Sequence, residues 1–143
     1  MSEQDNVKIA LAAFDDFNQH DVSRWRAYEA DNYVFVGPGA PGPMNGDQGR
    51  AYAQNFINAF PDLHFDVTRT IADGDFVVLN WIARGTHTGP LVAPSGAAIP
   101  PTHKHATTPG SNTYEFKNGK SVHNQTYWDM VGLLVQLGLM PPM

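Results

Sequence analysis

The sequence predicts an α+β fold. Helical patterns occupy most of residues 2–60 and a short segment after residue 129, whereas residues 63–128 carry segments in which apolar and polar side chains alternate. Tight-turn sequences join neighbouring alternating segments, which favours antiparallel pairing. Helices followed by a hairpin-linked sheet are typical of the α+β class, in which helices pack on one face of the sheet.

The first expected helix covers residues 2–20, where Ser2 and Asp5 resemble a capping pair. Its apolar side chains recur at intervals of three and four residues, as they do on one face of a helix. This stripe comprises Val7, Ala10, Leu11, Phe14 and Phe17. A second, shorter helix is expected over residues 21–30.

A Gly- and Pro-rich loop separates a short expected strand, residues 33–36, from a third helix. Asn45 can cap this helix, and Gln48 stands three residues later, where it completes a capping box. Pro61 ends the helix, because the residue before a proline avoids helical dihedral angles.

The alternating segments predict four strands, and a last helix follows them. The strands are residues 63–71, 76–87, 112–116 and 121–128. Hairpin turns are expected at residues 72–75 and 118–119, and a loop rich in Gly, Pro and Ala covers residues 88–101. A closing helix is expected over residues 130–137, with Gly138 at its end. Long strands curl as they twist, so helices across the concave face would leave a tapered cavity.

Composition limits the classes of function. The chain has 143 residues, which indicates one domain with one core. A net charge of -5 and scattered basic residues argue against a nucleic-acid partner. The absence of cysteine excludes disulfides, thiol catalysis and thiolate metal sites. No signal-peptide pattern and no apolar run of membrane length occur, so we expect a soluble cytoplasmic protein without a membrane partner.

Three stretches carry a resemblance to a known family: AFPDLHFDV (residues 59–67), GTHTGPL (85–91) and YWDMVGLLVQLG (127–138). In this order and spacing they resemble the SnoaL-like polyketide cyclase family, often labelled ester cyclase, of the NTF2-like superfamily. The resemblance covers nearly the whole chain after Gly46. It implies a cone-shaped barrel made of a curved, mostly antiparallel sheet, with the N-terminal helices over its concave face. It also implies a pocket inside the cone, a homodimer and no cofactor.

The same resemblance implies a reaction. Characterised members close a ring of an aromatic polyketide ester by intramolecular aldol condensation. An aspartate near the end of the last strand serves as the acid/base, and Asp129 matches it. Aldol closure removes a proton beside one carbonyl and delivers a proton to the oxygen of another. One carboxyl group can do both if its pKa is raised toward the working pH.

Asp129 has two interpretations. Tyr127 and Trp128 precede it, and aromatic walls would raise its pKa because desolvation disfavours the carboxylate. Alternatively, it stands directly before the closing helix, where aspartate is a favoured N-cap and cap hydrogen bonds lower the pKa. The sequence leaves both roles open, and Asp129 is the first catalytic candidate.

His103 and His105 form the second candidate group. Either imidazole could donate to an enolate oxygen or act beside Asp129 as a second acid/base, and we expect catalysis from His105. With His87 or His123 they could also form a three-imidazole metal site, but no compact ligand spacing supports one, so no metal is predicted. The alternative is a solvated pair at the edge of a loop.

Candidate substrate contacts lie on the expected strands and loops. Along residues 122–129, the odd-numbered side chains share one face of a regular strand. The even-numbered side chains could equally face the pocket, because a single bulge exchanges the two faces. The expected substrate contacts are Tyr33, Asn45, Trp81, His87, His103, His123, Gln125 and Tyr127. For the aromatic members, core packing is the alternative.

These observations predict a cofactor-free acid/base enzyme that acts on a medium-sized hydrophobic carbonyl compound, in the first place an aldol-type polyketide ester cyclase. An isomerase, a dehydratase or an epoxide hydrolase is the enzymatic alternative, because a fold does not determine its chemistry. The non-catalytic alternative is a module that binds a hydrophobic ligand. The expected partners are a small hydrophobic molecule and a second copy of the chain.

Overall fold

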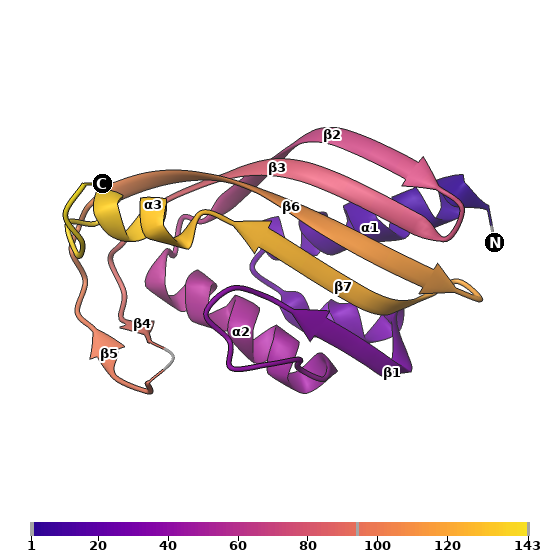
Figure 1. Ribbon diagram of the computed structural model, residues 1–143, viewed down its shortest axis with the longest axis horizontal. Coiled ribbons are helices and arrows are strands. Elements are labelled where there is room, and N and C mark those ends of the chain that lie inside the picture. The colour runs from indigo at the N-terminus through magenta and orange to yellow at the C-terminus, as the bar shows by residue number, and fades with distance from the viewer. Residues whose placement is uncertain (1, 94, 143) are drawn as a thin grey trace.

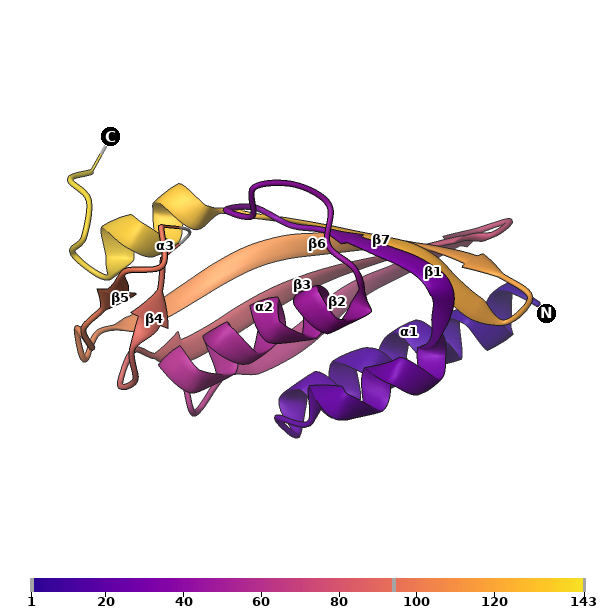
Figure 2. The same cartoon turned by 90° about the horizontal axis from the view of Figure 1, so that it is seen from below.

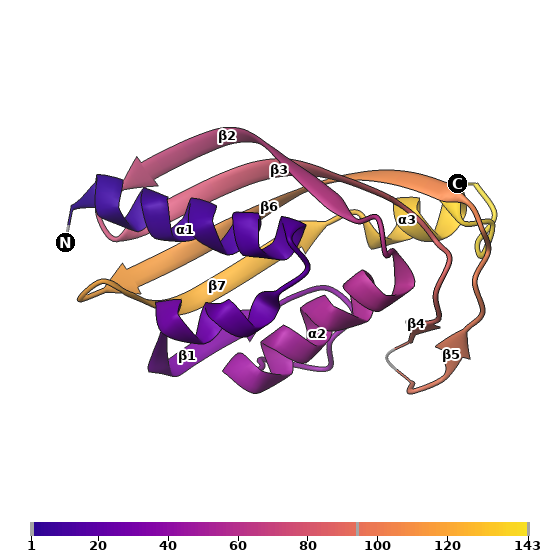
Figure 3. The same cartoon turned by 180° about the vertical axis from the view of Figure 1, so that it is seen from behind.

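The computed structural model describes residues 2–93 and 95–142. One layer is a curved five-stranded sheet, and two helices from the N-terminal half lie under its concave face (Figures 1 and 2). The predicted α+β class is confirmed. Seen from behind, α1 lies across β2 and β3, and α2 lies beside β1 (Figure 3).

Both expected capping boxes are present. Helix α1 (Glu3–Asn18) is capped by Ser2, whose Oγ accepts from the Asp5 backbone at 3.1 Å. Helix α2 (Gly46–Ala59) is capped by Asn45, whose Oδ1 accepts from the Gln48 backbone at 2.9 Å. Each cap satisfies backbone donors that have no partner within the first helical turn.

The second expected helix is shorter and of a different type. It is the 3-10 helix η1 (Val22–Tyr28), and the strand that follows, β1 (Glu29–Val36), begins earlier than predicted. The indole Nε1 of Trp25 donates to the Ala13 carbonyl at 2.8 Å, which ties η1 to α1. Glu29, which was expected within this helix, is instead the first residue of β1.

The main sheet has the strand order β1-β7-β6-β3-β2. Its other members are β2 (His64–Asp73), β3 (Phe76–Thr86), β6 (His105–Lys117) and β7 (Lys120–Trp128). Strand β1 runs parallel to β7, and the remaining pairs are antiparallel. Within the loop predicted over residues 88–101, β4 (Leu91–Val92) and β5 (Ala98–Ile99) form a small hairpin.

Strand β6 is longer than the predicted segment because Pro109 and Gly110 interrupt the alternation without ending the strand. Pairing with β7 stops at Gly110, so Pro109 lies where β6 has a free edge and its missing N–H leaves no gap in that ladder. Near this edge, the Gln136 side chain accepts from the Thr107 N–H at 2.8 Å and donates to the Thr107 carbonyl at 3.0 Å.

The register of β2 corrects one prediction about its buried face. The alternation along residues 63–71 predicts that Ile71 is buried on the same face as Phe65, but Ile71 is 49% exposed. A register irregularity between Val67 and Arg69 exchanges the two faces of the strand at that point.

The core lies between the concave face and the helices. The alternation along residues 76–87 predicts one buried face, and the side chains of Leu79 and Trp81 on this face of β3 are buried. Phe65 packs edge-on against Trp81, with ring centroids 4.9 Å apart. On β6, Gly110 lies under the Trp81 ring, and a Cβ there would fall 2.2 Å from the indole. Only glycine therefore fits at position 110, where the backbone of β6 lies against the indole ring carried by β3.

Helix α3 (Met130–Gln136) follows β7 and contacts β6. Leu133 of α3 and Leu137, the C-cap residue, are buried, and Gly138 follows with a positive φ of 75°. Over residues 2–93 and 95–142, every helix is either too short or too polar to cross a membrane.

Candidate functional site

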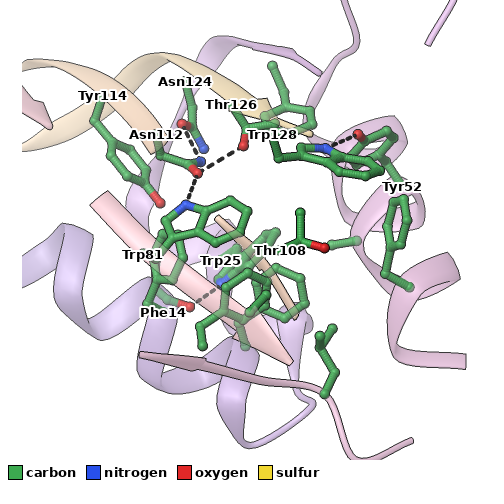
Figure 4. A pocket seen from close by; sticks show the side chains of 18 of the residues that line it. Phe14, Trp25, Tyr52, Trp81, Thr108, Asn112, Tyr114, Asn124, Thr126 and Trp128 are labelled. Atoms are coloured by element: carbon green, nitrogen blue, oxygen red, sulfur yellow. Dashed lines mark hydrogen bonds between the residues drawn. The ribbon is translucent and has the colours of Figure 1, made fainter. Parts of the chain in front are cut away.

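A cavity of about 120 Å³ lies between the sheet and the helices (Figure 4). Its wall draws side chains from every helix and from all five strands of the main sheet, and most of them are apolar or aromatic. The rings include Phe14, Trp25, Tyr52, Trp81, Tyr114 and Trp128. A cavity of roughly 150 Å³ accommodates benzene, so this space suits a ligand, or part of one, of about one aromatic ring.

A buried polar cluster on β3, β6 and β7 forms one part of the wall (Figure 4). Asn112 is its centre: its Oδ1 accepts from Trp81 Nε1 at 2.8 Å and from Thr126 Oγ1 at 3.0 Å. Its Nδ2 donates to Asn124 Oδ1 at 3.0 Å. Because these polar groups satisfy one another, the cluster is rigid and holds the indole in one orientation.

Two tyrosines flank this cluster. Burial raises the pKa of Tyr33 on β1 and of Tyr114 on β6, and a hydrogen bond with the Asn124 side chain opposes the rise in both. Both phenols therefore stay protonated at physiological pH and can act as hydrogen-bond donors. On α2, burial raises the pKa of Tyr52 to about 12, and its hydroxyl accepts from Trp128 Nε1 at 3.0 Å.

The structure brings few of the predicted site residues together. Tyr33 and Trp81 line the cavity. The others lie outside its wall, namely Asn45, His87, His103, His105, His123, Gln125, Tyr127 and Asp129. Asn45 is engaged as the cap of α2.

Asp129 occupies the position that its capping interpretation requires. Its Oδ1 accepts from the Gly132 N–H at 2.8 Å, at the start of α3, and the residue is exposed. This differs from the expected carboxylate against aromatic walls, because the neighbouring Trp128 turns inward and Asp129 does not. A catalytic role for Asp129 stays a prediction.

The even-numbered side chains of β7 are the inner set. Asn124 and Thr126 are buried opposite Tyr114 and Asn112, whereas Tyr127 is 59% exposed on the convex face. His123 and Gln125, which share its parity, are also outside the cavity wall. Asn112 and Asn124 were not identified as site residues from the sequence. The one available signal was that Asn124 lies two residues before Thr126 and therefore on the same face of the strand.

The histidines are dispersed. His105, the first residue of β6, is exposed, with Nδ1 3.2 Å from Thr86 Oγ1, and His103 is exposed with a φ of 60°. His87 is fully buried and stacks on Phe60, with centroids 5.3 Å apart. Among the residues that the structure describes, no three His, Asp or Glu side chains are grouped so as to hold a metal ion.

Burial lowers the pKa of His87 below its usual value of 6.5. The folded chain therefore binds this proton less readily than the unfolded chain, and its stability should decline as the pH falls below about 6.5. His87→Gln removes this group and should flatten the decline between about pH 7.5 and about pH 5, a range that brackets the ordinary pKa of histidine. Urea unfolding at each pH measures it. His64→Gln, at a partly exposed position, is the control, and equal slopes in both variants would contradict the prediction.

Comparison with known proteins supports the fold. The sequence model of one family, described as SnoaL-like polyketide cyclase, matches residues 8–137. Among curated proteins, none matches the sequence.

Three solved structures are similar over almost their entire lengths. AclR from Streptomyces galilaeus, a proposed hydroxylase, has a TM-score of 0.85 and 22% identity, covering 99% of this chain and 86% of its own. A proposed SnoaL-like polyketide cyclase from Jannaschia sp. CCS1 has a TM-score of 0.83 and 19% identity over 97% and 94%. IdmH from Streptomyces antibioticus, a proposed polyketide cyclase, has a TM-score of 0.78 and 26% identity over 92% and 97%. Because the family match spans nearly the whole sequence, the chain belongs to the SnoaL-like polyketide cyclase family.

Proposed function

We propose that this chain binds a hydrophobic carbonyl compound in the aromatic cavity and closes a ring in it by an aldol-type condensation. The observation that carries the proposal is the cavity itself, whose wall is mostly apolar and rich in aromatic rings but includes a compact cluster of polar side chains. Membership of the SnoaL-like polyketide cyclase family and the likeness to IdmH, a proposed polyketide cyclase, favour cyclisation over other reactions on this fold.

The polar part of the wall has the chemistry that an enolate needs. Charge develops on a carbonyl oxygen when the neighbouring carbon loses a proton, and fixed donors in a dry site stabilise that charge. Tyr33 and Tyr114 supply protonated hydroxyls next to the Asn124 amide. Aromatic rings around the substrate hold its reacting carbons close together, which replaces a bimolecular encounter by an oriented one. These protein groups can perform the reaction without a cofactor.

The cavity is tested by filling it. Thr108 is buried within the wall, in the middle of the lining side chains (Figure 4). Thr108→Phe would place a ring in the space and should weaken binding of acetophenone, a ketone with one aromatic ring, by at least ~10-fold, the loss expected when buried apolar contact of about 1.4 kcal/mol is denied. Quenching of tryptophan fluorescence measures the affinity, because Trp25, Trp81 and Trp128 all line the cavity.

Thr107→Phe is the matched control, because Thr107 precedes Thr108 on β6 and is exposed on the other face. It should bind the ketone as the unaltered chain does. If Thr108→Phe binds equally well, or if no variant binds the ketone, the cavity is not the ligand site. Ring closure of an aryl diketone is then followed by chromatography coupled to mass spectrometry. The aldol product is an isomer of unchanged mass that elutes separately, and dehydration lowers the mass by one water.

A further inference from the structure

The cavity wall contains an acidic side chain that the sequence did not single out. Glu29 is the first residue of β1, opposite Ser121 of β7, and it lines the cavity with its side chain 10% exposed. Within the described residues, it is the one carboxyl group in that wall.

The first turns of helix α2 pack against the Glu29 carboxylate. Arg50 Nη1 pairs with Glu29 Oε1, and the Arg50 side chain is itself 12% exposed. Gly46, the first residue of α2, lies so close that a Cβ there would be 2.6 Å from Glu29 Oε1. The pair continues outward through Asp47, whose Oδ1 is 2.5 Å from Arg50 Nη2 and 3.3 Å from Arg26 Nη2. A chain of alternating charges thus links the cavity to the surface.

The surroundings of Glu29 suit a base. Burial raises its pKa above the usual 4.5, and the Arg50 guanidinium opposes the rise. Arg50 occupies Oε1, and within the described part of the chain no hydrogen bond engages Oε2. The charge of Glu29 contributes to the raised pKa of Tyr33 and of Tyr114, so it lies within electrostatic reach of both phenol donors.

We infer that Glu29 is the general acid/base of the cavity, positioned by Arg50. This inference rests on the proposed function. The Glu29 carboxylate takes a proton from the carbon beside a substrate carbonyl, and the C–H electron pair passes into the enolate, whose oxygen accepts hydrogen bonds from Tyr33 and Tyr114. The enolate carbon bonds to a second carbonyl carbon, and that carbonyl's oxygen takes the proton back from Glu29. No co-reactant is needed.

A carbon acid with a coloured product tests the base without knowledge of the natural substrate. In 5-nitrobenzisoxazole, a base takes the proton from C3, the C–H electron pair completes a nitrile, and the N–O bond breaks toward a phenolate oxygen. The chain should accelerate this elimination, and Glu29→Gln should lower the rate by at least ~100-fold, a typical contribution of a general base. Glu115→Gln, which changes a carboxylate outside the cavity wall, should leave the rate unchanged.

The outcomes separate the base from the proposed function. Binding of the probe is measured by tryptophan quenching, and folding of each variant by circular dichroism. If the probe does not bind, the proposed ligand site fails. If it binds but the chain gives no acceleration, or folded Glu29→Gln retains the rate, Glu29 is not the base. Loss of turnover in Asp129→Asn with full turnover in Glu29→Gln would likewise overturn the inference.

The pH profile gives a second test that does not alter Glu29. The negative charge of Asp47 raises the pKa of Glu29, and the positive charge of Arg26 lowers it. Since the carboxylate is the base, Asp47→Asn should move the midpoint of the rising rate to lower pH, and Arg26→Gln should move it to higher pH. Both residues are exposed, so the variants should fold, and salt should reduce both shifts. Unmoved midpoints would overturn the inference, whether or not Glu29→Gln folds.

Discussion

Replacing Asn112 with leucine is expected to lower the free energy of unfolding by about 3–5 kcal/mol, because each buried group left without a partner loses about 1–3 kcal/mol. The change removes the acceptor of Trp81 Nε1 and of Thr126 Oγ1, and the donor to Asn124. The Trp81 N–H suffers most, since an indole nitrogen can only donate and its ring is held over Gly110. Urea unfolding followed by circular dichroism measures the loss.

Asn32→Leu is the matched control, because Asn32 is an exposed asparagine on β1. It should change the stability by no more than about 0.5 kcal/mol, as surface substitutions usually do. A double variant that adds Thr126→Val to Asn112→Leu should lose less than the sum of the single losses, because the two residues share one hydrogen bond. Strict additivity, or a loss no larger than that of the control, would show that the cluster is not a unit.

The second large effect is expected at Arg50. Arg50→Leu leaves the largely buried Glu29 without its cation, which should lower the free energy of unfolding by about 3 kcal/mol near pH 7. The loss should depend on pH. With Arg50 gone, the pKa of Glu29 in the folded chain rises further above the usual value of 4.5. Its protonated form therefore stabilises the folded state at pH values below 4.5, and this stabilisation is lost as the pH rises through the pKa of the folded chain. Unfolding measured between pH 4 and 8 (a range on either side of the usual Glu value) reveals this.

The double variant Arg50→Leu with Glu29→Gln isolates the cause. It removes the unpaired charge and should recover most of the stability near pH 7, while abolishing the pH dependence. Arg26→Leu is the control at the exposed end of the same charge chain, where an ion pair contributes little. If Arg50→Leu is as stable as Arg26→Leu at every pH, the Glu29–Arg50 pair is not a buried unit.

Much of the fold could be predicted because its signals are local. The capping boxes at Ser2 and Asn45 and the alternation in β3 depend on residues only a few positions apart. The start of β1 could not be predicted, because the polar segment 29–32 has no strand pattern and is ordered by pairing with β7, far away in sequence. The length of β6 was hidden for a similar reason, since Pro109 is tolerated only where β7 has already ended.

The candidate site was less predictable than the fold. Trp81 and Tyr33 were found because aromatic residues on strands are recognisable as pocket or core positions. Asn112 was missed because an asparagine on a strand is usually exposed, and its inward direction follows from pairing with Thr126. Glu29 was missed because its partner, Arg50, comes from a helix that only the folded chain brings close.

Gln136 and Pro109 have a consequence beyond this one molecule. A strand edge that ends in open backbone invites another chain to add to it, and such addition starts edge-to-edge aggregation. Here the glutamine amide already occupies both backbone groups of Thr107, and the proline next in line offers no N–H to an incoming strand. The stretch of β6 beyond β7 is thereby protected from self-association, although it belongs to the longest strand of the sheet.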